Sequence, residues 1–140
     1  MKKLSISVLV ICLSYLASAQ NHPHPGALNG KWIFVSSSEV DLGKIPDNQL
    51  PDLVMEDSAK VFSGSAGCNK ISGSYETEAG EFSFGPMIST FKACPDMQVE
   101  KYITHFLPLV GSYKIEENKL YLYDKNDKSK FIIYRRSNVI

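Results

Sequence analysis

Among the side chains of this sequence that can do chemistry, the cysteines are the most informative. Cys12 lies in an apolar run near the amino terminus, and Cys68 and Cys94 lie in the body of the chain. If export removes the amino-terminal run, an even pair remains in an oxidising compartment, where a structural disulfide is the usual outcome. A metal pair or a redox thiol couple is the alternative, but zinc needs four ligands and redox couples favour a C-x-x-C spacing. We therefore expect a Cys68–Cys94 disulfide.

The sequence does not contain a recognisable catalytic constellation. The stretch from Gly64 to Gly67 lacks the spacing of a nucleophile elbow, and neither a Gly-rich phosphate loop nor a His-Glu-x-x-His motif is present. His105 lies among apolar neighbours with no nucleophile in view, so a structural histidine is the simpler interpretation. We expect a protein that is not an enzyme and needs no cofactor, with a small enzyme of unrecognised site as an alternative.

Two groups of residues could in principle hold a metal ion. Cleavage after Ala19 would make His22 the third residue of the mature chain, where imidazole, amine and two backbone amides can bind Cu(II) or Ni(II) in a square plane. Cyclisation of an amino-terminal Gln20 would remove that amine. Five acids also gather loosely, without the spacing of a calcium loop: Asp41, Asp47, Asp52, Glu56 and Asp57. A solvated acidic loop is the simpler interpretation, and we expect no metal site.

The amino terminus has the pattern of a secretory signal peptide. Two lysines precede an apolar run from Leu4 to Leu16, and a small-x-small cleavage site ends at Ala19. A membrane anchor is the alternative, but an apolar run of about a dozen residues is too short to span a bilayer comfortably. The bulky Ile11 before Cys12 argues against lipid attachment. We therefore expect cleavage after Ala19 and a periplasmic or secreted protein that is not a lipoprotein.

Length and charge limit the number of domains and the class of partner that the remaining chain can have. Removal of residues 1–19 would leave about 120 residues, the length of one domain. The whole sequence has 15 basic and 15 acidic side chains and a formal net charge of zero, which argues against a general nucleic-acid binder. Prolines and glycines indicate a flexible lead-in over residues 20–27. We expect one domain over residues 28–137, a monomer, and no membrane span.

The elements expected in this domain are mostly strands. A helix over about residues 96–107 follows from Pro95 at the first helical position and from an apolar stripe that includes Phe106. Residues 39–53 have the composition of a long loop. Strands are predicted over residues 32–35, 54–56, 60–62, 71–77, 81–84, 112–116, 119–123 and 130–135. These elements indicate an α+β fold, a curved antiparallel sheet, partly closed like a barrel or sandwich, with one packed helix.

The last strands of this sheet are apolar on both faces. Alternation places Leu120 and Leu122 on the face opposite Tyr121 and Tyr123, and the helix can cover only one face. The rest of the curved sheet is the expected cover for the other face. The alternative is an exposed aromatic patch with a basic rim, which would mark a binding surface. Our hypothesis for that alternative is a binding face formed by Tyr121, Tyr123 and Tyr134.

A combination of short motifs runs through the body of the chain: Gly30-Lys31-Trp32, Gly67-Cys68-Asn69, Gly73-Ser74-Tyr75, Phe84-Gly85-Pro86, Thr90 to Cys94, Glu100, Tyr113, Leu120 and Leu122. In this combination, from about Leu28 to Arg136, the sequence resembles the META domain, or HslJ-like, family. Lys92 departs from the methionine-like residue usual in the family, and we interpret it as a surface change.

The resemblance implies an envelope protein with a small mixed β fold, for which no reaction is established. Bacterial members are linked to heat shock and antibiotic resistance, and relatives occur beside lysozyme-inhibitor-like domains. We therefore expect a non-enzymatic, stress-associated or antibiotic-resistance-associated envelope protein. Its partner would be another envelope protein, another macromolecule or a hydrophobic ligand. A lysozyme-inhibitor-like module is the alternative.

Overall fold

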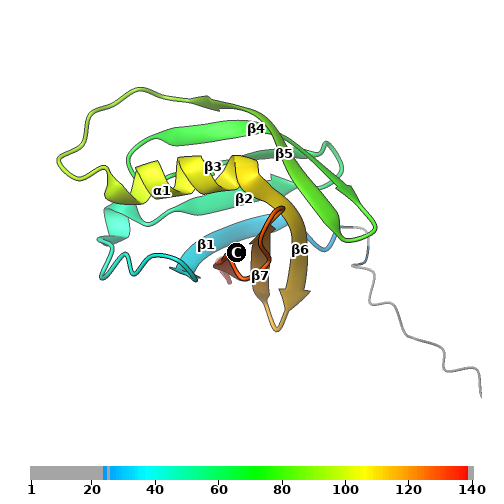
Figure 1. The fold of residues 1–140 in the computed structure, drawn as a ribbon. Helices are drawn as coiled ribbons and strands as arrows, with labels where there is room; N and C mark the ends of the chain where they lie inside the picture. Colours follow the sequence, from blue (N-terminus) through cyan, green and yellow to red (C-terminus); the bar gives the residue numbers. More distant parts are fainter. Residues whose placement is uncertain (1–23, 25, 139–140) are drawn as a thin grey trace, which may run out of the picture.

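The computed structural model describes residue 24 and residues 26–138, in which eight strands and one α-helix are found (Figure 1). The helix is α1 (Gln98–Phe106), and short 3-10 turns occupy η1 (Asp47–Gln49) and η2 (Leu107–Leu109). The strands are β1 (Gly30–Ser37), β2 (Asp52–Glu56), β3 (Val61–Ser65), β4 (Lys70–Glu78), β5 (Glu81–Ser89), β6 (Val110–Glu116), β7 (Lys119–Asp124) and β8 (Phe131–Arg136).

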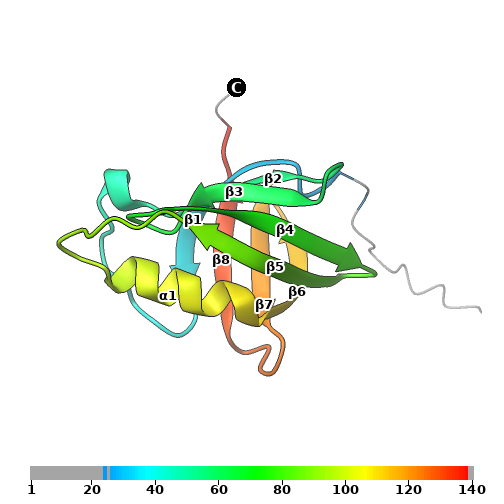
Figure 2. The same ribbon diagram turned by 90° about the horizontal axis from the view of Figure 1, so that it is seen from above.

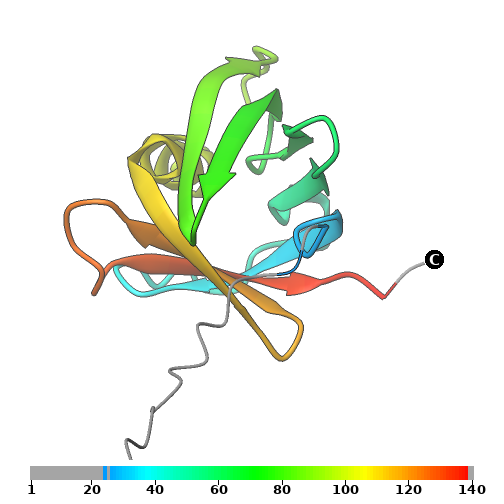
Figure 3. The same cartoon turned by 90° about the vertical axis from the view of Figure 1, so that its right-hand side faces the viewer.

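The strands form a closed antiparallel barrel (Figure 3). Each strand pairs with its neighbour in the chain, and β8 pairs with β1 to complete the ring. The join between β5 and β6 is the narrowest, because only Glu81 and Ser112 are paired there. The predicted curved antiparallel sheet with one helix is therefore confirmed, and its closure is complete.

The barrel interior is filled by alternate side chains from every strand. Leu120 and Leu122 are fully buried, as alternation predicts, and belong to the single apolar core. Two large aromatic residues bury their rings while their polar tips find partners, as such residues require. The Trp32 indole N–H donates to the Leu28 carbonyl at 2.7 Å, and the Tyr75 hydroxyl donates to Asp57 at 3.1 Å.

Helix α1 lies across one end of the barrel, between β5 and β6 in the chain (Figure 2). Its Phe106 side chain is buried in the core, whereas His105 is exposed. Tyr102 forms a hydrogen bond with Ser37 at the end of β1. The helix begins two residues later than predicted, because the Asp96 carboxylate lies before it and accepts the Gln98 N–H at 2.9 Å.

Most strand boundaries differ from the sequence prediction by one or more residues, and the differences in β2 and β5 have a clear structural context. β2 begins at Asp52, inside the predicted loop, and β5 continues past Pro86 to Ser89. Proline lacks the N–H that a second neighbouring strand would need. It fits here because β5 pairs with β6 only at Glu81 and is paired beyond that residue with β4 alone. Gly73 permits the close β4–β5 approach, since a Cβ atom there would lie 2.7 Å from the Pro86 carbonyl oxygen.

The assignment of Tyr134 to a binding face is wrong. Tyr134 lies opposite Leu120 in the β7–β8 register, so its side chain points into the barrel and is 0% exposed. Its ring packs edge-on against Phe34, with centroids 5.9 Å apart. Among the described residues, its hydroxyl is the one buried side-chain polar atom without a hydrogen-bond partner. Burial raises the pKa of this hydroxyl well above its usual value.

Candidate functional site

The Asn69 side chain connects three segments that are distant in sequence. Its Oδ1 accepts hydrogen bonds from the Lys92 backbone N–H at 2.7 Å and the Thr90 hydroxyl at 2.9 Å. Its amide nitrogen donates to the Lys92 carbonyl at 3.1 Å and to Glu100 Oε1 at 2.6 Å. All these bonds are long-range, unlike the local turn cap for which asparagine is often used. Asn69 therefore fixes the segment after β5 against the start of β4.

Glu100 completes this network from the first turn of α1. The carboxylate is buried, with 8% of the residue exposed, and three N–H groups compensate it. Oε2 accepts the backbone N–H of Cys68 at 2.9 Å and that of Asn69 at 2.6 Å, and Oε1 accepts the Asn69 amide. A buried carboxylate is tolerated when charge-assisted hydrogen bonds of this kind satisfy it. Glu100 therefore clamps the Gly67–Asn69 turn to the helix.

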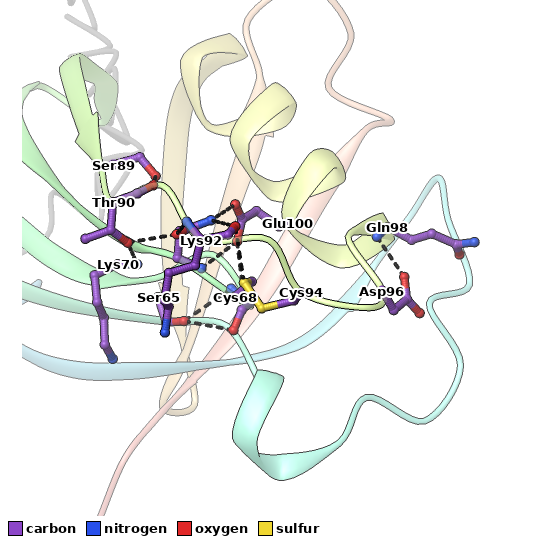
Figure 4. The surroundings of a disulfide bond; sticks show 12 residues. Ser65, Cys68, Lys70, Ser89, Thr90, Lys92, Cys94, Asp96, Gln98 and Glu100 are labelled. Atoms are coloured by element: carbon purple, nitrogen blue, oxygen red, sulfur yellow. Dashed lines mark hydrogen bonds between the residues drawn. A yellow bond between two sulfur atoms is a disulfide. The ribbon is translucent and has the colours of Figure 1, made fainter.

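The expected disulfide lies beside this clamp (Figure 4). Cys68 and Cys94 are bonded, with Cα atoms 6.1 Å apart, and both residues are half-buried. The segment over residues 90–94, which we call the tethered loop, is thus held at Thr90, Lys92 and Cys94. Three separate attachments restrict its backbone, so its side chains are presented in a defined arrangement.

The tethered loop presents an aromatic ring to solvent. Phe91 is fully exposed, and Ile88 in the preceding strand is 73% exposed. These are the two most exposed large apolar side chains in the described part of the chain. Lys92 is also exposed, in agreement with its interpretation as a surface change. Large apolar side chains held outward on a restrained backbone are candidates for a contact surface.

A groove of about 520 Å³ lies beside Ile88 on the outer face of β1 to β5. One row of paired residues crosses β2 to β5 in the order Val54, Ser63, Ser72, Ile88. The two small serines leave a depression between the larger apolar side chains, and their hydroxyls line it. The groove can offer hydrogen bonds to an extended partner, but no paired nucleophile and base lines it.

The predicted tyrosine face keeps Tyr121 and Tyr123 but contains Phe131 in place of Tyr134. Tyr121 and Tyr123 point outward and are half-buried, with ring centroids 6.3 Å apart. Phe131 is paired with Tyr123 and packs 5.8 Å from its ring, so it takes the place assigned to Tyr134. The expected cover by another part of the sheet is absent from the described residues, because the sheet closes around a single interior. Strand alternation already contained the signal for Phe131.

The end of the barrel opposite α1 holds a second compensated carboxylate. Asp57 accepts hydrogen bonds from Lys60, from the Tyr75 hydroxyl and from the Gly26 backbone N–H. Burial opposes ionisation of Asp57, yet these donors together hold its pKa below the usual value. Burial and the Asp57 charge raise the pKa of Tyr75 far above its usual value. The cluster therefore ties Gly26, Lys60 and Tyr75 together through one carboxylate.

Comparison with known structures identifies related folds. An NMR structure of a protein from Burkholderia xenovorans aligns with a TM-score of 0.66 at 21% identity, over 82% of this chain and 89% of that one. A second NMR structure aligns with a TM-score of 0.60 at 19% identity, over 78% and 90%. A crystal structure of a DUF4847 family protein from Bacteroides vulgatus gives 0.57 at 15% identity, over 81% and 96%. These likenesses support the fold alone.

Two predictions about the membrane and the amino terminus can be placed against the structure. No helix in residue 24 and residues 26–138 is long and apolar enough to cross a membrane. His22 and the predicted signal peptide lie outside the described residues.

The family comparison covers the segments that build the clamp. No curated protein matches the chain. The META domain model matches residues 28–136, which include the Cys68–Cys94 disulfide and the residues bonded to Asn69. The chain therefore belongs to the META domain family.

Proposed function

We propose that this protein is exported and acts without catalysis, by binding another protein through Phe91 and Ile88. The observation that carries the proposal is the exposure of Phe91 on a loop held by a disulfide and by Asn69. Apolar anchors that enter a partner pocket dominate binding energies at protein interfaces. Anchors held on a restrained backbone also lose little conformational entropy when they bind.

The groove beside Ile88 supports a protein partner. Ser63 and Ser72 offer hydroxyls, and Lys31 and Lys70 extend the polar lining. Lys31 is already paired with Asp52 at 2.8 Å. An apolar anchor flanked by hydrogen-bonding groups has the composition of a protein interface, with an apolar centre and a polar rim.

The compensated carboxylates support a role without catalysis. The buried Glu100 accepts three N–H groups, and the partly buried Asp57 accepts hydrogen bonds from three donors. A general base must lie within hydrogen-bond reach of the proton that it takes from a substrate, and both carboxylates are engaged by donors of the protein itself. The Cys68–Cys94 disulfide and the signal-like amino terminus support export. A role in heat stress or antibiotic resistance follows from the family resemblance and is part of this proposal.

The outer face of β7 and β8 is a second candidate surface, formed by Tyr121, Tyr123 and Phe131. Its rings are half-buried against one another. Tyrosines are frequent in interfaces, but these rings expose less apolar surface than Phe91 and Ile88. We therefore rank this face second.

Capture of proteins from an envelope extract separates the two surfaces. We expect Phe91→Ser with Ile88→Ser to lose a specifically captured protein, while Tyr121→Ala with Tyr123→Ala retains it. Val35→Ser is the matched control, since Val35 is an exposed apolar residue of β1. Each variant should keep its melting temperature within a few degrees.

The reverse pattern of capture would move the site to the tyrosine face. Equal capture by all variants would refute both surfaces. Titration of the captured protein against purified variants then gives the loss of affinity directly, and titration with lysozyme tests the lysozyme-inhibitor alternative. Turnover of ester, peptide or glycoside substrates that depended on one carboxyl group would refute the non-enzymatic part of the proposal.

A further inference from the structure

A second concave region lies beneath the long segment that joins β1 to β2. Its volume is about 460 Å³, and it is lined by the end of β1 and by residues 38–43, 45 and 50. Cavities of roughly 300–1,000 Å³ are typical of small-molecule sites. This region, which we call the loop pocket, shares no lining residue with the groove beside Ile88.

Part of the lining of the loop pocket is apolar, and polar residues such as Ser36, Ser37 and Ser38 form much of the rest. Phe34 forms part of its floor and is buried in the core. Leu42, Ile45 and Leu50 come from the covering segment and are only partly buried where they pack against that core. These side chains are sufficient to surround the hydrocarbon part of a small ligand.

The segment over the pocket is anchored at its ends and not in its middle. Ser38 exchanges hydrogen bonds with Phe131, and Glu39 pairs with Lys130 at 2.8 Å. Within residues 40–45 the hydrogen bonds are local, such as the one that the Gly43 N–H donates to Asp41 at 2.9 Å. Outward movement of residues 40–45 therefore breaks apolar contacts but no hydrogen bonds between barrel strands. Opening of this segment to admit a ligand costs little free energy for that reason.

The charged groups that line the pocket are both acidic. Glu39 is neutralised by Lys130, whereas Asp41 is exposed and has an ion pair with no described residue. One Asp41 oxygen accepts the Gly43 N–H, and the other is available. A positive charge placed there would be attracted, and a negative charge would be repelled.

We propose that the loop pocket binds a small amphiphile with an apolar body and a single positive charge. The body lies against Phe34, Leu42 and Ile45, and the charge lies beside Asp41. This site is independent of the protein-binding surface proposed above, because the two are built from different residues.

Three probes with the same n-octyl chain test the proposal below their micelle concentrations: octyltrimethylammonium, octanol and octyl sulfate. We expect calorimetric titration of the whole mature protein to give the tightest binding for the ammonium. The sulfate should bind at least about tenfold more weakly, as one nearby unit charge predicts. Equal affinities, tighter sulfate binding or no ammonium binding would overturn the proposal.

Variants locate the site. Asp41→Asn, an exposed and nearly isosteric change, should remove most of the preference for ammonium over octanol. Leu42→Ser with Ile45→Ser should weaken the binding of all three probes. Val54→Ser, in the groove beside Ile88, is the matched control. Ammonium binding should also slow amide hydrogen exchange in residues 40–45. An unchanged preference in Asp41→Asn, or exchange slowed elsewhere instead, would refute the location even if the double variant failed to fold.

Discussion

The substitution Glu100→Gln tests whether the Gly67–Asn69 turn is held to α1 by a carboxylate that accepts hydrogen bonds through both oxygens. A glutamine side chain has the shape of glutamate but replaces one acceptor oxygen with an N–H₂ donor. Its oxygen can still accept the backbone N–H groups of Cys68 and Asn69. Its nitrogen would then face the Asn69 amide nitrogen, which donates to Glu100 Oε1 at 2.6 Å. Two donors would meet in a buried site.

Rotation of the Asn69 amide does not solve this conflict. After rotation, the Asn69 nitrogen would face the Lys92 N–H and the Thr90 hydroxyl, which Oδ1 now accepts. The variant therefore loses at least one charge-assisted hydrogen bond and leaves one donor unsatisfied. With about 1.5–3 kcal/mol for such a bond and about 1–3 kcal/mol for a buried unsatisfied donor, we expect a loss of about 2.5–6 kcal/mol in unfolding free energy.

Equilibrium unfolding in urea measures this loss. The matched control is Glu116→Gln, which breaks an ion pair with Lys114 in which both side chains are more than half exposed. That change should cost at most about 1 kcal/mol. Limited proteolysis should also show earlier cleavage near Lys92 in Glu100→Gln than in the control. Equal stability of the two variants would refute the assignment of Glu100 as the clamp.

Three further outcomes follow from burial and hydrogen bonding. Phe106→Ala should cost about 3–5 kcal/mol in urea unfolding because the ring is buried, whereas His105→Ala should be nearly neutral; reversed costs would contradict the helix orientation. Tyr134→Phe should leave stability unchanged or raise it by about 1 kcal/mol, since the hydroxyl has no partner, and a large loss would indicate an unseen bond. The lowered pKa of Asp57 contributes stability that is complete above its unfolded-state pKa and is lost as pH falls through the folded-state pKa. Unfolding measured from neutral to acidic pH should therefore depend less on pH in Asp57→Asn than in the parent.

Local sequence patterns predicted most of the elements but few of their long-range partners. Alternation in β7 separated Leu120 from Tyr121 correctly, because a strand side chain points according to its own position. Alternation in β8 puts Tyr134 on the same face as Ile132, and both side chains are buried. The binding-face hypothesis for Tyr134 did not follow this alternation and was therefore wrong.

The clamp could not be predicted in the same way. The sequence alone places Glu100 and Asn69 only within short motifs. Their bonds join residues that are 31 positions apart, so they depend on how α1 is placed against β4. Closure of the barrel by β1 and β8 is also a long-range event, which no pattern within either strand specifies.

The single residue pair between β5 and β6 has a mechanical consequence. Opening the ring at Glu81 and Ser112 breaks less of the ladder than opening it at any other strand boundary. The β4–β5 hairpin can therefore separate from β6 by local opening, while β6, β7, β8 and β1 stay paired. Ile88 lies at the other end of β5, next to the tethered loop that is fixed to Asn69 and Cys68, so a partner bound there would leave this join free to open.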